Sequence, residues 1–174
     1  MKKYEIIDVL ENEHQKLFDW LEKQPDEAWK KGPEGKWSTG QHILHLVNAI
    51  QKVNHAMSFP KFILKSKFGV SNRALRSYTA VVKRYQEKLI QNEERAKTYN
   101  TGTKIPSLKE KKQLLYTLTV QNKKLQHKTN KWKDAHLDTL LLPHPLLGKM
   151  PIREVLMWIA HHTAHHTETL IKNY

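Results

Sequence analysis

Residues 151–170 read PIREVLMWIAHHTAHHTETL and predict a long amphipathic helix close to the C-terminus. Pro151 suits the first helical position, because the backbone N–H that proline lacks would have no partner there. With about 100° of rotation per residue, one face of this helix is apolar in its first half and continues into histidines. That face holds Ile152, Val155, Ile159, His162, His166 and Leu170. An apolar face of this length needs other helices to cover it.

The same stretch offers two histidine pairs spaced four residues apart, His161/His165 and His162/His166. Side chains four apart lie on one helix face, with Cβ atoms roughly 5–6 Å apart. The second pair continues the apolar face, whereas the first falls on a more polar stripe and is expected at the boundary of the core. That polar stripe also holds Glu154, Trp158 and Glu168. Buried polar groups need partners, so the inward pair either shares a metal ion or forms hydrogen bonds in the core.

Three more long helices are predicted upstream, and they define the fold class. The first spans about Tyr4 to Glu22 and has a stripe of Ile7, Leu10, His14, Leu17 and Leu21. Capping boxes at Ser38 and Ser107 open two others, which run to about Met57 and about Trp132. A weaker amphipathic helix lies between those two, with a stripe of Leu75, Tyr78, Val82, Tyr85 and Leu89. We therefore predict an all-α protein, a four-helix bundle with an accessory helix between its second and third helices.

The connections are predicted to be short or irregular. Asp26–Trp29 is expected to form a turn of helix, and Pro60 to Gly69 a basic connector. Residues 140–148, LLLPHPLLG, are expected to be an irregular apolar link, because two prolines and a glycine disfavour both a helix and a central strand. We find no internal repeat and no linker, so residues 1–174 are expected to form a single domain.

The composition narrows the chemistry and the compartment. The chain of 174 residues has no cysteine, which excludes disulfides, thiolate zinc sites and a cysteine nucleophile. The N-terminus has no apolar region of a secretory signal, and no apolar stretch approaches the roughly 20 residues of a membrane span. We therefore expect a cytoplasmic protein.

The chain is strongly basic, with a formal net charge of +13. Such a charge attracts nucleic acid, a membrane surface or small anions. Lysine dominates and no aromatic-interleaved recognition motif is present, so a solvated lysine-rich surface is favoured over nucleic acid or a membrane as partner. A basic helical binding module without enzymatic activity remains an alternative hypothesis.

A catalytic metal site of histidines would need a third ligand beside His162 and His166. His45 is the best candidate, because it lies in mid-helix beside the apolar row of Leu46 and Ile50. His14 competes, since it interrupts the stripe of the first helix. His42 precedes His45 by three residues and is expected to point partly outward. Spacing alone does not choose among these three histidines.

The order of several short motifs resembles that of the DinB superfamily, which includes the bacillithiol- and mycothiol-dependent transferase type. The motifs are Gly35-Lys36-Trp37-Ser38, His45-Leu46, Pro143-His144-Pro145-Leu146-Leu147-Gly148 and His162-Thr163-Ala164-His165-His166. The resemblance covers about Tyr4 to Leu170 and implies that His45, His162 and His166 hold one divalent metal ion. Many members follow the last ligand with Arg-Gly-Gln, where this chain has Thr167-Glu168-Thr169, so the resemblance does not carry over a particular substrate.

The function implied by this resemblance is transfer of a low-molecular-weight thiol to an electrophile. The implied cofactor is a divalent transition metal, zinc or nickel, with the thiol as cosubstrate and a small molecule as partner. Metal-dependent hydrolysis at the same three histidines is the alternative, because an ion with an open position activates water as well as thiols. Gln41 and Glu168 are candidates to orient the ligands, and a homodimer is allowed.

Overall fold

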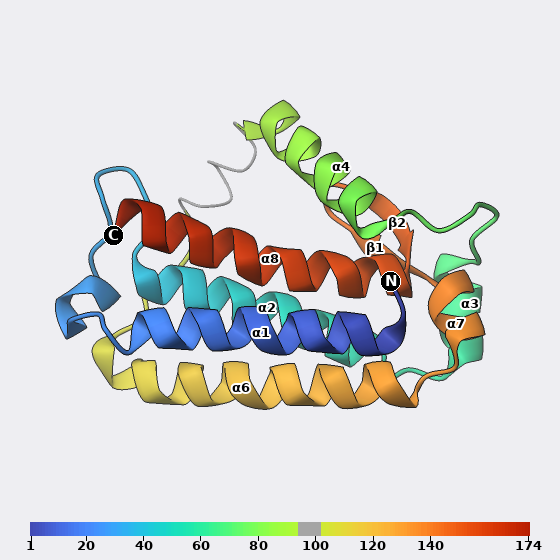
Figure 1. The fold of residues 1–174 in the computed structure, drawn as a ribbon, viewed down its shortest axis with the longest axis horizontal. Helices are drawn as coiled ribbons and strands as arrows, with labels where there is room; N and C mark the ends of the chain where they lie inside the picture. The colour runs from blue at the N-terminus through green and yellow to red at the C-terminus, as the bar shows by residue number, and fades with distance from the viewer. Residues whose placement is uncertain (94–101) are drawn as a thin grey trace.

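The computed structural model describes residues 1–93 and 102–174. Four long helices form the bundle: α1 (Lys3–Leu21), α2 (Thr39–Ala56), α6 (Leu108–Lys131) and α8 (Ile152–Asn173). Figure 1 shows α2 and α6 running in one direction and α1 and α8 in the other. Each of α1 and α2 packs against both α6 and α8. The predicted all-α, four-helix bundle is confirmed, and the parallel pair α2 and α6 requires a crossover connection.

The core is built from one apolar stripe of each bundle helix. On α1 the buried residues are Ile6, Leu10, His14, Leu17 and Leu21. The prediction of Ile7 in this stripe was wrong, because a spacing of four residues from Leu10 places Ile6 on the buried face. On α8 the predicted face is buried throughout, but Glu154 and Trp158 of the neighbouring stripe are buried as well. This helix is therefore covered on two sides.

Both predicted capping boxes are present. The backbone N–H of Ser38 donates to Gln41 Oε1 at 2.8 Å, and that of Ser107 donates to Glu110 Oε2 at 2.8 Å. These bonds fix where α2 and α6 begin. The short helix η1 (Asp26–Trp29) is also as predicted, and its Trp29 packs so closely that a Cβ on Gly40 would lie 2.9 Å from the Trp29 carbonyl oxygen.

Up to residue 93, where the described part of the crossover from α2 to α6 ends, the chain forms two helices rather than one. Residues Lys61–Phe68 form α3, so the prediction of a connector there was wrong. The accessory helix α4 (Tyr78–Gln91) is confirmed, and it lies along α8 on the outside of the bundle (Figure 1). Its buried residues are Val81 and Tyr85, so the predicted inward position of Val82 was one residue off.

An ion pair between the fully buried carboxylate of Glu154 and two partly exposed arginines joins the crossover to the start of α8. Glu154 accepts two hydrogen bonds from the Arg73 guanidinium, at 2.7 and 2.8 Å, and one from the backbone N–H of Arg76 at 2.8 Å. Burial alone would raise the pKa of Glu154, but these hydrogen bonds outweigh it and lower the pKa. Glu154 therefore fastens the segment before α4 to the bundle.

The predicted irregular link at 140–148 is instead a small antiparallel hairpin of β1 (Leu141–His144) and β2 (Gly148–Pro151). Pro143 pairs with Lys149 in this hairpin. A ribbon of two strands has two free edges, so it tolerates a proline that a central strand would not. Gly148 has a φ of 74°, which suits glycine at the tight turn. Helix α8 begins after Pro151, which is its N-cap and not its first residue.

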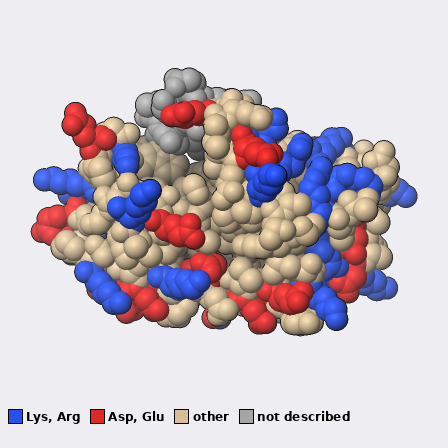
Figure 2. Space-filling view, turned by 45° about the horizontal axis from the view of Figure 1, so that its top comes forward, with Lys and Arg blue, Asp and Glu red and all other residues tan. Residues whose placement is uncertain are grey.

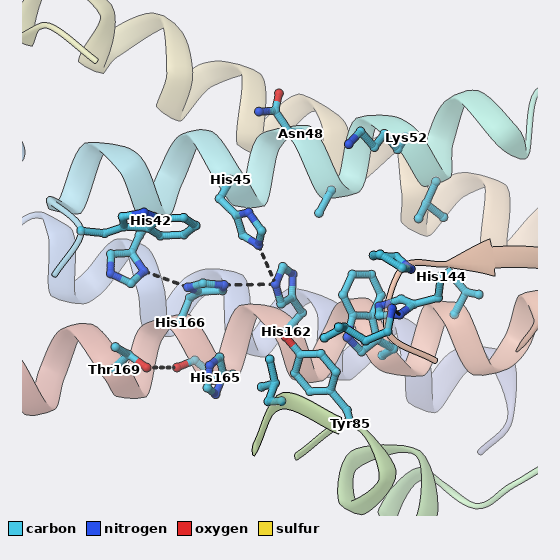
Figure 3. A pocket seen from close by; sticks show the side chains of 18 of the residues that line it. His42, His45, Asn48, Lys52, Tyr85, His144, His162, His165, His166 and Thr169 are labelled. Carbon is cyan, nitrogen blue, oxygen red and sulfur yellow. Dashed lines mark hydrogen bonds between the residues drawn. The ribbon is translucent and has the colours of Figure 1, made fainter. Parts of the chain in front are cut away.

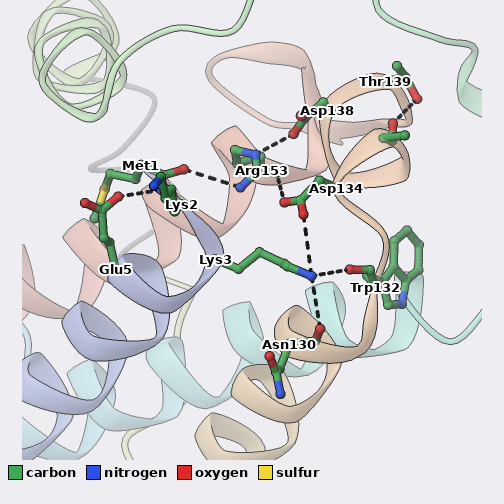
Figure 4. Close-up of polar contacts among 11 residues, drawn as sticks. Met1, Lys2, Lys3, Glu5, Asn130, Trp132, Asp134, Asp138, Thr139 and Arg153 are labelled. Carbon is green, nitrogen blue, oxygen red and sulfur yellow. Dashed lines mark hydrogen bonds and ion pairs between the residues drawn. The ribbon is translucent and has the colours of Figure 1, made fainter.

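Polar contacts fasten one end of the bundle (Figure 4). Lys3, in α1, donates to the carbonyl oxygens of Asn130 at 3.2 Å and Trp132 at 2.9 Å, where α6 ends. Arg153, in α8, binds the carboxylates of Asp134 and Asp138 in the short helix α7 (Asp134–Thr139), which the sequence did not predict. These contacts hold the start of α8 in a fixed position relative to α1 and α6.

The surface is charged with both signs, and none of the described helices has the length and apolar character needed to cross a membrane. Figure 2 shows lysine and arginine side chains gathered toward the end that carries α3 and α7. Part of this charge packs within the protein, since Lys61 Nζ lies 3.8 Å from the centre of the Trp132 ring. Such a contact is a cation–π interaction.

Candidate metal centre

Three histidines from two antiparallel helices converge between α2 and α8. His45 comes from α2, and His162 and His166 come from successive turns of α8 (Figure 3). His162 Nε2 lies 3.0 Å from His45 Nε2 and 3.0 Å from His166 Nε2. Among the described residues, these three form the one cluster whose ligand atoms all lie within 4.8 Å of one another. The structure therefore brings together the three residues that the resemblance implied.

The cluster fits a metal ion better than a set of hydrogen bonds. A neutral imidazole Nε2 offers either one hydrogen or one lone pair, so His162 Nε2 can satisfy only one of its two neighbours. Zn²⁺ binds histidine nitrogen at about 2.0–2.1 Å, so tetrahedral geometry places two such nitrogens roughly 3.3 Å apart. The observed 3.0 Å separations need only a small outward shift to reach that geometry. The alternative of hydrogen-bonded core histidines leaves one of the three nitrogens without its bond.

Aromatic rings pack against the three clustered histidines. Trp158, one turn before His162 on α8, stacks on the His162 ring with centroids 4.6 Å apart. Trp37 lies parallel to the His166 ring, with centroids 6.1 Å apart, and 5.1 Å from the His45 ring. His162 and His166 are buried, with 2% and 7% of their surfaces exposed. The position of each ring is thus fixed by packing before any ion binds.

A hydrogen-bonded chain runs outward from His166. His166 Nδ1 lies 2.8 Å from His42 Nδ1, and His42 Nε2 lies 3.5 Å from Tyr174 Oη. Tyr174 Oη–H in turn donates to the carbonyl oxygen of Trp37. If His166 presents its Nε2 lone pair to a metal, its Nδ1–H donates to His42 and every later bond in the chain has a consistent direction.

Two predictions about the residues around the cluster were wrong. His42 is buried and faces the cluster, whereas the sequence suggested that it points partly outward. Gln41 and Glu168 do not orient the ligands: the Gln41 amide bonds to Ser38 and to the Thr103 carbonyl oxygen, and Glu168 is exposed. The only signal for His42 in the sequence was its spacing of three residues from His45, which is compatible with a shared face.

The three clustered histidines are held in the neutral form, which is the form that binds metals. Burial, together with the weaker effect of the positive charge of Lys52, lowers the pKa of His45 to about 4. Burial also lowers the pKa of His162 and of His166 well below the usual range. Neutral imidazoles leave their lone pairs free, and three of them leave the full charge of a divalent ion uncompensated.

The remaining histidines near the tract lie outside the cluster. His161 and His165 are half-buried at the boundary, as predicted from their polar stripe. His14 is buried in α1, where its Nε2 lies 3.3 Å from Thr119 Oγ1 and its ring packs on Phe18. It does not belong to the cluster of His45, His162 and His166.

His144 builds the hairpin turn. Its Nδ1 accepts hydrogen bonds from the backbone N–H groups of Leu146 at 3.1 Å and Leu147 at 3.0 Å. Its ring stands edge-on to Trp158, with centroids 4.2 Å apart. His144 therefore helps to position Trp158, the ring that stacks on His162. This contact is a structural reason for a histidine in the motif of residues 143–148.

A cavity of about 880 Å³ opens beside the three histidines. Its walls come from α2, α3, α4, α8, the hairpin and the segment before α2. They are largely apolar and aromatic, and they include Trp37, Phe68, Tyr85, Leu89, Leu142 and Trp158. A cavity of this size and character suits a small organic molecule. A metal ion bound by the histidines would face that molecule through its open position.

Comparison with known proteins agrees with this architecture. The family model of the DinB superfamily matches residues 10–170, which include α2, α6, most of α1 and α8, and the three clustered histidines. Searches of curated proteins and of solved structures gave no match to the chain.

Proposed function

The chain belongs to the DinB superfamily, and on this premise we propose that it binds one divalent transition metal ion and transfers a low-molecular-weight thiol to an electrophile. His45, His162 and His166 are the ligands, and zinc or nickel is the expected metal. The observation that carries the proposal is the convergence of three neutral imidazole nitrogens at the wall of an apolar cavity.

The side chains in and around the cluster have different proposed roles. The three ligands hold the ion and take no part in proton transfer, because their lone pairs are used in binding. His42 and Tyr174 orient His166, and Trp37 and Trp158 pack against the ligand rings. When bound, a divalent ion would supply Lewis acidity and favour the thiolate form of a bound thiol. The apolar walls exclude water from the electrophile.

Metal analysis of untagged protein tests the site directly. We expect about one equivalent of a transition metal per chain, and His162→Ala should reduce it to a trace, because two histidines alone bind weakly. His161→Ala is the matched control, since it removes the neighbouring half-buried histidine of the same helix and should keep the metal. Stable, metal-free wild-type protein after growth and refolding with zinc or nickel would refute the site.

Turnover separates the two enzymatic hypotheses. The metal-loaded protein should consume a model electrophile only when a thiol is present, and the His162→Ala variant should lose this activity. Turnover of ester substrates in the absence of thiol, lost in the same variant, would instead favour metal-dependent hydrolysis. Full activity after replacement of all three histidines would exclude both.

A further inference from the structure

The charged side chains that line the cavity beside the histidines are all positive. Among its described lining residues there is no aspartate or glutamate, whereas Lys36 and Lys52 both line it. The three ligand histidines add no negative charge, because they are neutral. A ligand of this cavity therefore meets positive groups and apolar walls, and a negative group on that ligand would be stabilised there.

Lys52 lies on the same helix as His45 and close to it. Seven residues separate the two, which is two helical turns or about 10 Å along the axis. Asn48 and Ala49 lie between them and also line the cavity. Figure 3 shows Lys52 on α2, the helix that carries His45.

The two lysines differ in their partners. Lys36 Nζ donates to Asn173 Oδ1 at 2.6 Å. Lys52 is exposed and has neither a carboxylate partner nor a hydrogen bond within residues 1–93 and 102–174. Other lysines of the bundle do have such partners, for example Lys123 with Glu11 at 2.5 Å and Lys111 with Asp26 at 2.7 Å. Lys52 is thus free to pair with a ligand.

We propose that Lys52 is an anion subsite and that the thiol cosubstrate carries a carboxylate, joined to its sulfur by an apolar spacer. This inference rests on the proposed function, since it assumes that the sulfur lies at the metal. The sulfur and the carboxylate would then be separated by roughly 10 Å, the distance between the turns of α2 that carry His45 and Lys52. The flexible stem of lysine allows a shorter separation.

Matched ligands test the subsite. Isothermal titration calorimetry of zinc-loaded protein would compare mercaptohexanoate with mercaptohexanol, which differ in the carboxylate. We expect the wild-type protein to bind mercaptohexanoate roughly two- to five-fold more tightly, the range for an ion pair at an exposed lysine. Lys52→Met keeps the apolar stem and should abolish the preference.

A second lysine controls for the overall charge. Lys112 is exposed on α6, outside the cavity lining, so Lys112→Met changes the net charge by the same amount and should keep the preference. Equal binding of the two thiols to the wild-type protein, or a preference that survives Lys52→Met, would overturn the proposal.

Metal-free protein separates this proposal from the metal centre. Hexanoate and hexanol have no sulfur, so their binding does not depend on a metal. We expect the metal-free wild-type protein to prefer hexanoate, and the Lys52→Met variant to show no preference. If the protein took up no zinc, this arm would still decide the role of Lys52. Equal binding of hexanoate and hexanol to the wild-type protein would exclude the subsite.

Discussion

At the level of single residues, the candidate metal centre depends on which ring nitrogen of each histidine carries a hydrogen. His42 decides this for His166, because their Nδ1 atoms lie 2.8 Å apart and one must donate to the other. When His166 donates, its Nε2 lone pair is free to face the ion. Tyr174 extends the chain by holding the other nitrogen of His42.

Replacing His42 should therefore weaken metal binding without removing a ligand. For His42→Phe we expect a loss of roughly 10- to 100-fold in metal affinity, the usual effect of removing a group that orients a metal-bound histidine. Tyr174→Phe should have a smaller effect in the same direction, because it acts through His42. Competition with a chelator of known affinity measures both, with His161→Phe as control. Unchanged affinity in His42→Phe would show that packing alone orients His166.

The sequence predicted the three clustered histidines better than it predicted the residues around them. Helical phase selected His162 and His166, because α8 is regular and its buried face is continuous. Helical phase could not place His42, because residues 39–43 at the start of α2 are all buried. Where every side of a helix is buried, the phase does not distinguish an inward from an outward residue. The resemblance, and not spacing, distinguished His45 from His14.

At the level of secondary structure elements, Glu154 is the residue that fixes the accessory helix. The segment that leads into α4 reaches the bundle through the hydrogen bonds of Arg73 and Arg76 to this fully buried carboxylate. Tyr85 of α4 lines the cavity beside Trp158. The ion pair thus positions one wall of the cavity.

Glu154→Gln should loosen this wall. Loss of one partner from a buried ion pair lowers the free energy of unfolding by about 3–5 kcal/mol. Because Arg73 and Arg76 can reach water here, we expect a loss at the lower end of this range. Hydrogen exchange should become faster in α4 and in the segment before it, with little change in α6. Glu11→Gln, which breaks the exposed pair with Lys123, should change the free energy of unfolding by less than about 1 kcal/mol. Equal protection of α4 in both variants would contradict this role.

Short elements were the ones that the sequence missed. Helices α3 and α7 have eight and six residues, which are too few to show a clear hydrophobic period. Helix α3 is rich in lysine and follows Pro60, and α7 follows Trp132 and Lys133. The hairpin was missed because its prolines were weighed against a central strand, and a two-stranded ribbon lacks that restriction. Long helices with capping boxes were predicted to within one or two residues.

At the level of the whole molecule, the crossover creates the cavity. Because α2 and α6 are parallel, the chain must return along the bundle between them, and α4 lies on α8 as it does so. The cavity is enclosed by this return and by the hairpin, since Phe68, Leu89 and Leu142 all line it. An up-and-down bundle with short loops would leave the histidines at an open groove between two helices.

Buried neutral histidines should make the stability of the molecule depend on pH. Burial lowers the pKa of His14 to about 4 and that of His144 to about 4, whereas both should titrate near 6.5 when the chain is unfolded. Between these values the unfolded state binds protons that the folded state does not. The free energy of unfolding should therefore be greatest above pH 6.5 and fall as the pH is lowered toward 4, by up to about 3 kcal/mol for each histidine.

Urea denaturation of metal-free protein at several pH values between about 7.5 and 4.5 measures this slope. His14→Gln can keep a polar group near Thr119 Oγ1 and removes the titration, so its slope should be shallower than that of the wild-type protein. His127→Gln, a change of an exposed histidine on α6, should leave the slope unchanged. If His14→Gln showed the full wild-type slope, the loss of stability would come from other buried histidines. His14 would then take up its proton at the same pH in the folded and the unfolded protein.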